Sequence, residues 1–93
     1  MTAPHPDLHT FAHHWQDEAD AAYLYRVLAS LEPDAMKRDV YQRLADVEDR
    51  HVSIWSKLIS ENGGTTGAFR PTGRTRLLAW LGSGAGLCLV ASR

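Results

Sequence analysis

The sequence predicts an all-α protein, in which an antiparallel two-helix hairpin dimerises into a four-helix bundle. Two long segments, residues 8–31 and 34–61, contain neither glycine nor proline and carry apolar residues at helical spacing. Only a short break separates the segments, so the two helices are expected to be antiparallel neighbours. A lone hairpin of this length leaves one apolar face open to water, and pairing with a second hairpin would cover that face.

The first helix is expected over Leu8–Leu31. Asp7 can cap its N-terminus, because a short side-chain oxygen at this position accepts hydrogen bonds from free backbone N–H groups. Residues 1–7 include two prolines and are expected to be a flexible start. The apolar and aromatic side chains that recur at helical spacing are Phe11, Trp15, Ala22, Tyr25 and Leu28.

The second helix is expected over Asp34–Glu61, so that residues 8–62 form the hairpin. The helix follows Pro33, because proline disfavours helix in the residue before it and tolerates the first turn after it. Gly63 follows the helix and suits the left-handed conformation that is common at helix C-termini. The inner arc of the helix is expected to contain Val40, Leu44, Val47, His51, Ile54, Trp55 and Leu58.

The rest of the chain is less regular. Residues 63–73 are rich in glycine and threonine and are expected to be a linker. Residues 74–93 are expected to be a short apolar C-terminal segment, either a frayed tail or a short helix that covers the dimer. The apolar stretch 77–91 is short for a membrane span. Three arginines within residues 70–76 form a modest basic patch that could touch a membrane surface or remain solvated.

Composition and charge narrow the classes of function. The chain has 93 residues, of which 44% are hydrophobic and 23% charged, as expected of one small globular unit. A formal net charge of −1, without a long basic stripe, gives no reason to expect nucleic acid. The single cysteine, Cys88, excludes an internal disulfide framework and fits a reducing compartment. The N-terminus has no signal-peptide pattern, so a cytoplasmic location is expected.

Glu48 and His51 form a Glu-x-x-His step that predicts a metal site. Positions i and i+3 are neighbours on one face of a helix, so both side chains can reach one ion. Glu18 lies 15 residues before Pro33 and Glu48 lies 15 residues after it, so an antiparallel hairpin places the two glutamates at the same height. In di-iron bundles, two helices each provide a Glu and two each provide a Glu-x-x-His. One chain therefore carries half of such a site, and two copies would complete it.

Two such half-sites would provide four carboxylates and two imidazoles. This ligand set suits iron or manganese better than structural zinc, although zinc could also bind. Tyr25 lies about two turns after Glu18 on the same face and could hydrogen-bond a ligand carboxylate or act as a redox neighbour. His14, one turn before Glu18, could line a path for incoming metal or belong to an exposed histidine run. Asp17 and Asp20 are expected to be solvated, although they could attract cations. Asp46 and Asp49 are expected on the outer face of the second helix.

At these residues the chain resembles two families of iron proteins. Residues 18–26 and 44–51, together with Trp55, resemble the rubrerythrin-type ferritin-like domain at the N-terminus of some vacuolar-iron-transporter-like membrane proteins. The resemblance covers about residues 10–80 and implies the ferritin-like four-helix fold. In that family a second Glu and a second Glu-x-x-His follow later, and neither motif is present in this sequence.

The second resemblance is to the encapsulated ferritins, which are two-helix chains whose di-iron ferroxidase site forms between two subunits. Their pattern of a Glu, a Tyr seven residues later and a Glu-x-x-His about thirty residues after the first Glu is matched by Glu18, Tyr25, Glu48 and His51. Those proteins also carry a C-terminal peptide that docks in a protein nanocompartment, and residues 81–92 are not a convincing match to it.

These resemblances imply an iron-binding ferroxidase that oxidises Fe(II) with oxygen or peroxide and acts as a homodimer or a multiple of dimers. Glu18 would bridge the metals, Glu48 would ligate and His51 would be the terminal nitrogen ligand, with Tyr25 beside them. The alternative is a non-catalytic module that senses or delivers iron or manganese to a transporter or compartment. A third possibility is a dimerisation hairpin in which Glu18 and His51 share a buried hydrogen bond without metal. A location inside a nanocompartment or at a membrane surface is compatible with both the ferroxidase and the sensing or delivery module.

Overall fold

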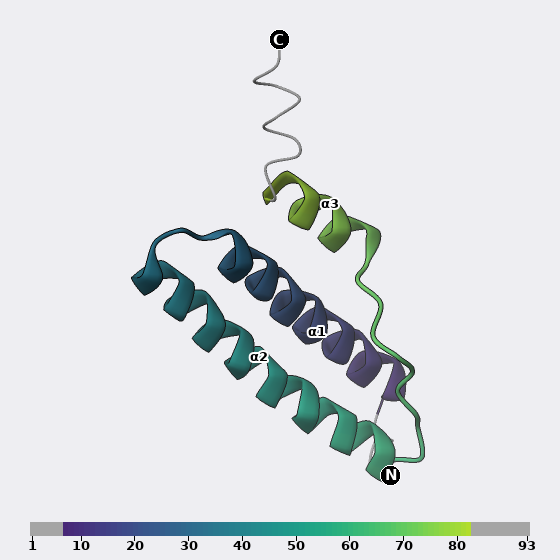
Figure 1. Cartoon of the computed structure of the whole chain (residues 1–93). Helices are drawn as coiled ribbons and strands as arrows, with labels where there is room; N and C mark the ends of the chain where they lie inside the picture. The colour runs from purple at the N-terminus through teal and green to yellow at the C-terminus, as the bar shows by residue number, and fades with distance from the viewer. Residues whose placement is uncertain (1–6, 83–93) are drawn as a thin grey trace.

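The computed structural model describes residues 7–82 as three α-helices and contains no strand within that range. The helices are α1 (Leu8–Leu31), α2 (Ala35–Glu61) and α3 (Gly73–Gly82). Figure 1 shows α2 antiparallel to α1, with α3 lying against α1 on the side away from α2. The all-α prediction and the helical hairpin are therefore confirmed. Dimerisation into a four-helix bundle stays a prediction.

Aspartate side chains cap the first two helices. The Asp7 carboxylate accepts hydrogen bonds from the backbone N–H groups of His9 and Thr10, at 3.0 and 3.3 Å. The Thr10 hydroxyl also donates to Asp7, and chiefly this hydrogen bond holds the pKa of the Asp7 carboxyl below its ordinary value. Asp34 accepts from the backbone N–H of Lys37 at 2.9 Å, so it precedes α2 as its N-cap. The second helix thus starts one residue later than expected.

Gly63 and Gly64 end α2. Gly63 adopts the left-handed conformation, with φ of +82°, and its N–H donates to the carbonyl oxygen of Ser60. The N–H of Gly64 donates to the carbonyl oxygen of Ile59 at 2.9 Å, which completes a Schellman motif. A β-carbon at Gly64 would lie 2.9 Å from the Ile59 side chain, so a larger residue there would force a shift. The predicted glycine stop is confirmed.

Small side chains dominate the buried positions of the hairpin. No large side chain of residues 7–82 is completely buried. Small residues let helices approach closely, because the distance between helix axes depends on the side chains at the contact. The buried hydrophobic residues of the hairpin are Ala19, Ala22, Ala29, Ala45 and Ile59. The hairpin therefore has a thin core, as its length and composition suggested.

An apolar stripe on α2 remains outside this core. Val40, Leu44, Val47 and Ile54 were expected on the inner arc, but their side chains are between 38% and 56% exposed. Met36 extends the same line by one turn and is also exposed. The expected inner arc is wrong for the four residues, because α1 packs against the adjacent side of α2 instead. These five residues are called the α2 stripe below.

Asp20 holds the segment before α3 against α1. Its side chain is 9% exposed, and its two carboxylate oxygens accept hydrogen bonds from the backbone N–H and the hydroxyl of Thr72, at 3.2 and 3.0 Å. Gln16 donates both to Asp20 and to the carbonyl oxygen of Arg70. The expectation that Asp20 is solvated is therefore wrong. Asp17 is exposed as expected, and lies 3.5 Å from His13.

Helix α3 forms the start of the C-terminal segment, so a short helix is present there instead of a frayed tail. That this helix covers a dimer stays a prediction. Within residues 7–82, no helix combines the length and the hydropathy needed to cross a membrane. Residues 1–6 and 83–93 lie outside the described residues, so the expected flexible start, Cys88 and most of the apolar tail are not tested.

Candidate metal centre

The structure brings Glu18 of α1 together with Glu48 and His51 of α2. One potential ligand atom from each residue lies within 4.8 Å of the other two. The Nδ1 atom of His51 lies 3.3 Å from Oε2 of Glu18 and 3.7 Å from Oε2 of Glu48. No other group of three or more His, Cys, Asp or Glu side chains within residues 7–82 has this geometry. The three residues singled out as ligands are thus neighbours in space.

Helix geometry explains why these three side chains meet. Glu48 and His51 are separated by three residues, so they project from one side of α2 on successive turns. Glu18 comes from the middle of α1, which runs the other way, and the two helices are joined by a short connection. The equal spacing of Glu18 and Glu48 from Pro33 therefore becomes an equal height in the hairpin, as the sequence predicts.

One oxygen of Glu48 lacks a hydrogen-bond partner. The Glu48 side chain is 20% exposed, and its Oε2 atom is buried without a donor among the described residues. Burial of a carboxylate oxygen is unfavourable unless a hydrogen bond, an opposite charge or a metal ion compensates for the lost water. The His51 ring lies next to this oxygen, but its Nδ1 atom, 3.7 Å away, is too far for a hydrogen bond. A bound cation would satisfy this oxygen.

A surface hollow gives access to the cluster. It is lined by Glu18, His51, Ile54 and Trp55. The His51 side chain is 46% exposed, so the cluster is open on the outer side of the hairpin. His14 stacks on Trp55 with 4.7 Å between ring centroids and an interplanar angle of 16°. The ring of His14 therefore lies beside the hollow, and His14 does not belong to the ligand cluster.

Tyr25, which was expected beside the metal, lies on α1 seven residues after Glu18. It is half-buried on α1, and no hydrogen bond within residues 7–82 joins it to Glu18, Glu48 or His51. Its expected part as a neighbour of the metal stays a prediction.

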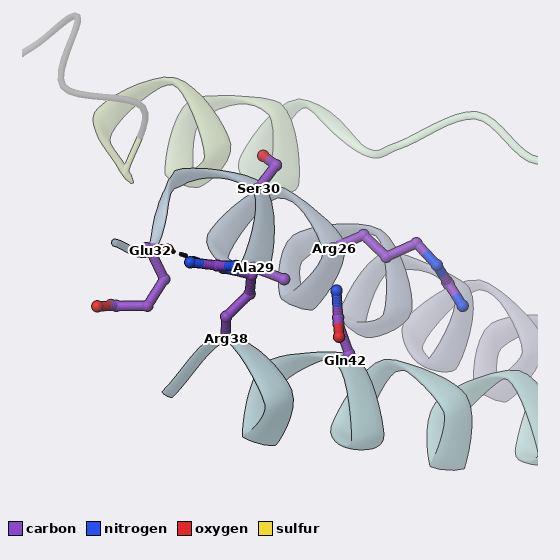
Figure 2. A pocket seen from close by; sticks show the side chains of 6 residues that line it. All are labelled: Arg26, Ala29, Ser30, Glu32, Arg38 and Gln42. Atoms are coloured by element: carbon purple, nitrogen blue, oxygen red, sulfur yellow. Dashed lines mark hydrogen bonds between the residues drawn. The ribbon is translucent and has the colours of Figure 1, made fainter. Parts of the chain in front are cut away.

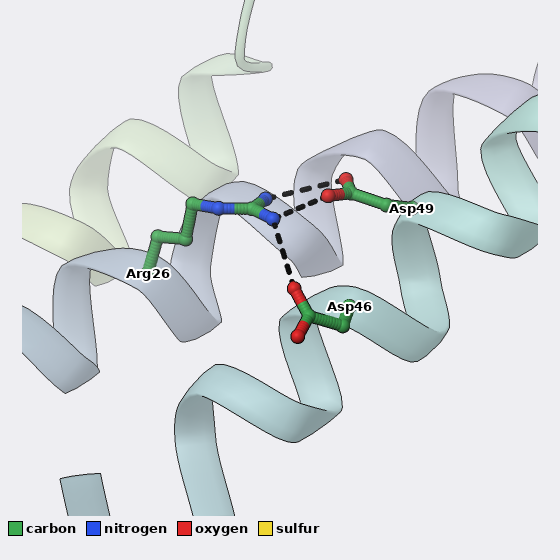
Figure 3. A network of polar contacts seen from close by, with 3 residues as sticks. All are labelled: Arg26, Asp46 and Asp49. Carbon is green, nitrogen blue, oxygen red and sulfur yellow. Dashed lines mark hydrogen bonds and ion pairs between the residues drawn. The ribbon is translucent and has the colours of Figure 1, made fainter. Parts of the chain in front are cut away.

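An ion pair beside the cluster joins the same two helices. Arg26 of α1 donates hydrogen bonds to both carboxylate oxygens of Asp49, and its Nη2 atom lies 3.7 Å from Asp46 (Figure 3). The hydrogen bonds to Asp49 raise the pKa of Arg26 above its ordinary value. Asp49 follows Glu48 directly, so this ion pair fixes the position of α2 relative to α1 next to the cluster. Asp46 and Asp49 are exposed, but the expected place on the outer face of α2 is wrong for Asp49, because its carboxylate turns toward Arg26 of α1.

A second hollow lies at the closed end of the hairpin (Figure 2), lined by Arg26, Ala29, Ser30, Glu32, Arg38 and Gln42. Arg38 donates to the backbone carbonyl oxygens of Glu32 and Pro33, each at 3.2 Å. These hydrogen bonds satisfy backbone carbonyl groups of the connection between α1 and α2. The hollow holds no group of potential metal ligands, and its two arginines both stabilise the hairpin.

Comparison of the chain with protein-family models, with curated proteins and with solved structures finds no match in any of the three. The resemblance to ferritin-like domains therefore rests on the residues quoted above and on their spacing.

The side chains of the cluster are of kinds that could hold a metal ion. They provide one imidazole nitrogen and two carboxylates, which is a hard, oxygen-rich set suited to iron or manganese. Three side chains on one exposed face leave several coordination positions to water or to ligands from another molecule. The arrangement can hold a cation and leave it accessible, which is required for exchange or for reaction with oxygen.

Proposed function

We propose that the protein binds iron and acts as a ferroxidase, at a di-iron site that forms between two subunits. The observation that carries this proposal is the contact of Glu18, Glu48 and His51 around a buried carboxylate oxygen with no hydrogen-bond donor. A carboxylate oxygen in this state is a place where a cation lowers the free energy of the folded chain.

The position of the α2 stripe supports the dimer. Val47 and Ile54 lie one turn before and one turn after His51, and both are exposed. A second hairpin packed on this line with two-fold symmetry would bury the stripe and bring the two clusters together. The paired site would contain four carboxylates and two imidazoles, which is the ligand set of di-iron helical bundles.

Fe(II) is the substrate of the proposed reaction. Each Fe(II) loses one electron, and two ions together reduce one oxygen molecule, with two protons, to hydrogen peroxide. Anionic oxygen ligands favour Fe(III) over Fe(II), because the ion of higher charge gains more from hard carboxylate ligands. Glu18 would bridge, Glu48 would ligate and His51 would hold the nitrogen position, while Tyr25 would stand nearby.

The test is an anaerobic Fe(II) titration followed by exposure to oxygen, with native mass measured in parallel. We expect binding to saturate near one iron per chain, followed by repeated oxidation seen in the absorbance of Fe(III). His51→Ala and Glu48→Gln should abolish both. His13→Ala and Glu61→Gln are matched controls, because these exposed side chains lie outside the cluster. Oxidation at the normal rate in either site variant would exclude this site.

The exposure of His51 also favours a second function, which is binding and delivery without turnover. An open half-site on a single chain could take up one Fe(II) or Mn(II) ion and pass it on. This function predicts stoichiometric binding, dependent on the same residues, without repeated oxidation. If the Glu18–His51 contact is instead only a hydrogen bond, added Fe(II) or Mn(II) would leave the melting temperature unchanged, because only ligands that bind the folded state raise it.

A further inference from the structure

Helix α3 places its small residues on the side that packs against α1. Thr75 and Ala79 are buried, and a β-carbon at Gly82 would lie 3.5 Å from the Leu28 side chain. The three positions are separated by four and three residues, so they share one side of the helix. Small residues thus bring α3 close to α1.

The opposite side of α3 carries large apolar residues that face solvent. At 100° per residue, positions 77, 80 and 81 lie opposite to Thr75 and Ala79. Leu77 and Leu81 are 56% and 46% exposed, and Trp80 is exposed as well. Among the described helices α3 contacts only α1, so no other described helix covers this face (Figure 1). Leu77, Trp80 and Leu81 are called the α3 ridge below.

Positive charge flanks the α3 ridge. On the helix, Arg74 and Arg76 lie on either side of the ridge, and both are exposed. Residues 62–82 contain three arginines and no acidic residue. Residues 7–61, in contrast, contain eleven acidic and six basic residues, which is a net charge of −5. Within the described chain, the segment with a net positive charge is therefore residues 62–82, which end with α3.

We propose that the α3 ridge docks on the surface of a membrane that contains anionic lipids. A helix with leucine and tryptophan on one face and arginine along its borders can insert its apolar face at the level of the headgroups. The arginines would contact lipid phosphates, while their aliphatic stems extend over the apolar surface. Both the apolar residues and the flanking arginines of this one helix could then contact the same planar lipid surface.

The hydrogen bonds that Thr72 donates to Asp20 keep α3 in the orientation that docking requires. They hold the chain at the start of α3, so that the small side of the helix stays on α1 and the ridge stays outward. Thr72 also accepts a hydrogen bond from the backbone N–H of Thr75 at 3.3 Å, which caps the helix. α2, which contributes two of the three clustered ligands, has no close contact with α3. The docking proposal is therefore independent of the proposed ferroxidase activity.

The test is sedimentation of the full chain with vesicles of phosphatidylcholine, alone or mixed with anionic phosphatidylglycerol. We expect binding to the mixed vesicles that weakens as salt is added. The double variant Arg74→Gln/Arg76→Gln should bind about 30-fold more weakly, at about 1 kcal/mol for each arginine. The matched control is Arg43→Gln/Arg50→Gln, which removes the same charge from exposed positions of α2 and should bind as the wild type.

The ridge itself is tested by Leu77→Ser/Leu81→Ser, which should reduce binding to mixed vesicles by roughly ten-fold or more. Circular dichroism checks that this variant keeps its helices, and the arginine variants provide a test that does not alter packing. Failure of the wild-type chain to bind mixed vesicles, or equal binding by Arg74→Gln/Arg76→Gln, would overturn the proposal. A change in native mass of Leu77→Ser/Leu81→Ser without vesicles would also overturn it, because the ridge would then bind a second copy of the chain.

Discussion

Glu48 is the residue whose environment most clearly departs from what stability alone would favour. A buried oxygen without a donor destabilises a folded chain by about 1–3 kcal/mol, unless something else compensates. Glu18 and His51 contact each other, which leaves the Glu48 oxygen as the unsatisfied member of the three. Cation-binding sites commonly contain such unsatisfied oxygens in the metal-free protein, because the bound ion removes their free-energy cost.

Glu48→Met should therefore stabilise the metal-free chain by about 1 kcal/mol, since a thioether of similar length has no unsatisfied charge. The measurement is urea unfolding in the presence of a chelator. Glu61→Met, at an exposed position, is the control and should change the free energy of unfolding by less than about 0.5 kcal/mol. Added Fe(II) should raise the stability of the wild type but not of Glu48→Met. A loss of stability in Glu48→Met without metal would show that the Glu48 oxygen is satisfied in another way.

Among the elements, α3 depends most on a single polar contact. Asp20→Ala should leave the backbone N–H of Thr72 without its acceptor and remove one of the two acceptors of Gln16, at a cost of about 1–3 kcal/mol, and should release α3 from α1. Amide hydrogen exchange would show faster exchange in α3 and nearly unchanged exchange in α2. Asp17→Ala is the matched control, because Asp17 is exposed and, among residues 7–82, pairs only with His13. Unchanged exchange in α3 of Asp20→Ala would show that apolar packing alone holds the helix.

The boundaries of the two long helices could be predicted because local chemistry determines them. Asp7, Asp34 and the Gly63–Gly64 pair each act within a few residues of their own position, so the signal is complete in the sequence. The height match of Glu18 and Glu48 could also be predicted, because it depends only on counting residues from the turn at Pro33.

The burial of Asp20 and the solvent exposure of the α2 stripe could not be predicted from the sequence in the same way. The partner of Asp20 is Thr72, 52 residues away, and no periodic pattern links them. The helical repeat marks an apolar line through Val40 and Val47, but it does not say which neighbour covers that line. Alanines at 19, 22 and 45 give only a weak apolar signal, although they form the contact that brings the helices together.

At the scale of the whole molecule, the α2 stripe predicts that the chain exists as a dimer. Val47→Glu/Ile54→Glu should convert the native mass from twice the chain mass to the 10.3 kDa of one chain, because buried like charges would face each other across the two-fold axis. Native mass spectrometry measures this change. Leu77→Glu, on the exposed ridge of α3, is the control and should remain a dimer. A wild-type chain that is monomeric with and without iron would exclude the shared site.

The position of the metal cluster along the hairpin has a kinetic consequence. Glu48 is the central residue of α2, and Glu18 lies close to the centre of α1. Helices open from their ends, so the backbone amides around these two residues should be the last to exchange with solvent. The ion pair of Arg26 with Asp49, the residue after Glu48, adds a contact between the two helices near the cluster. Fraying at either end of the hairpin can therefore occur many times without separating the ligands. The rate at which a bound ion is released is then not set by the rate at which the helix ends open.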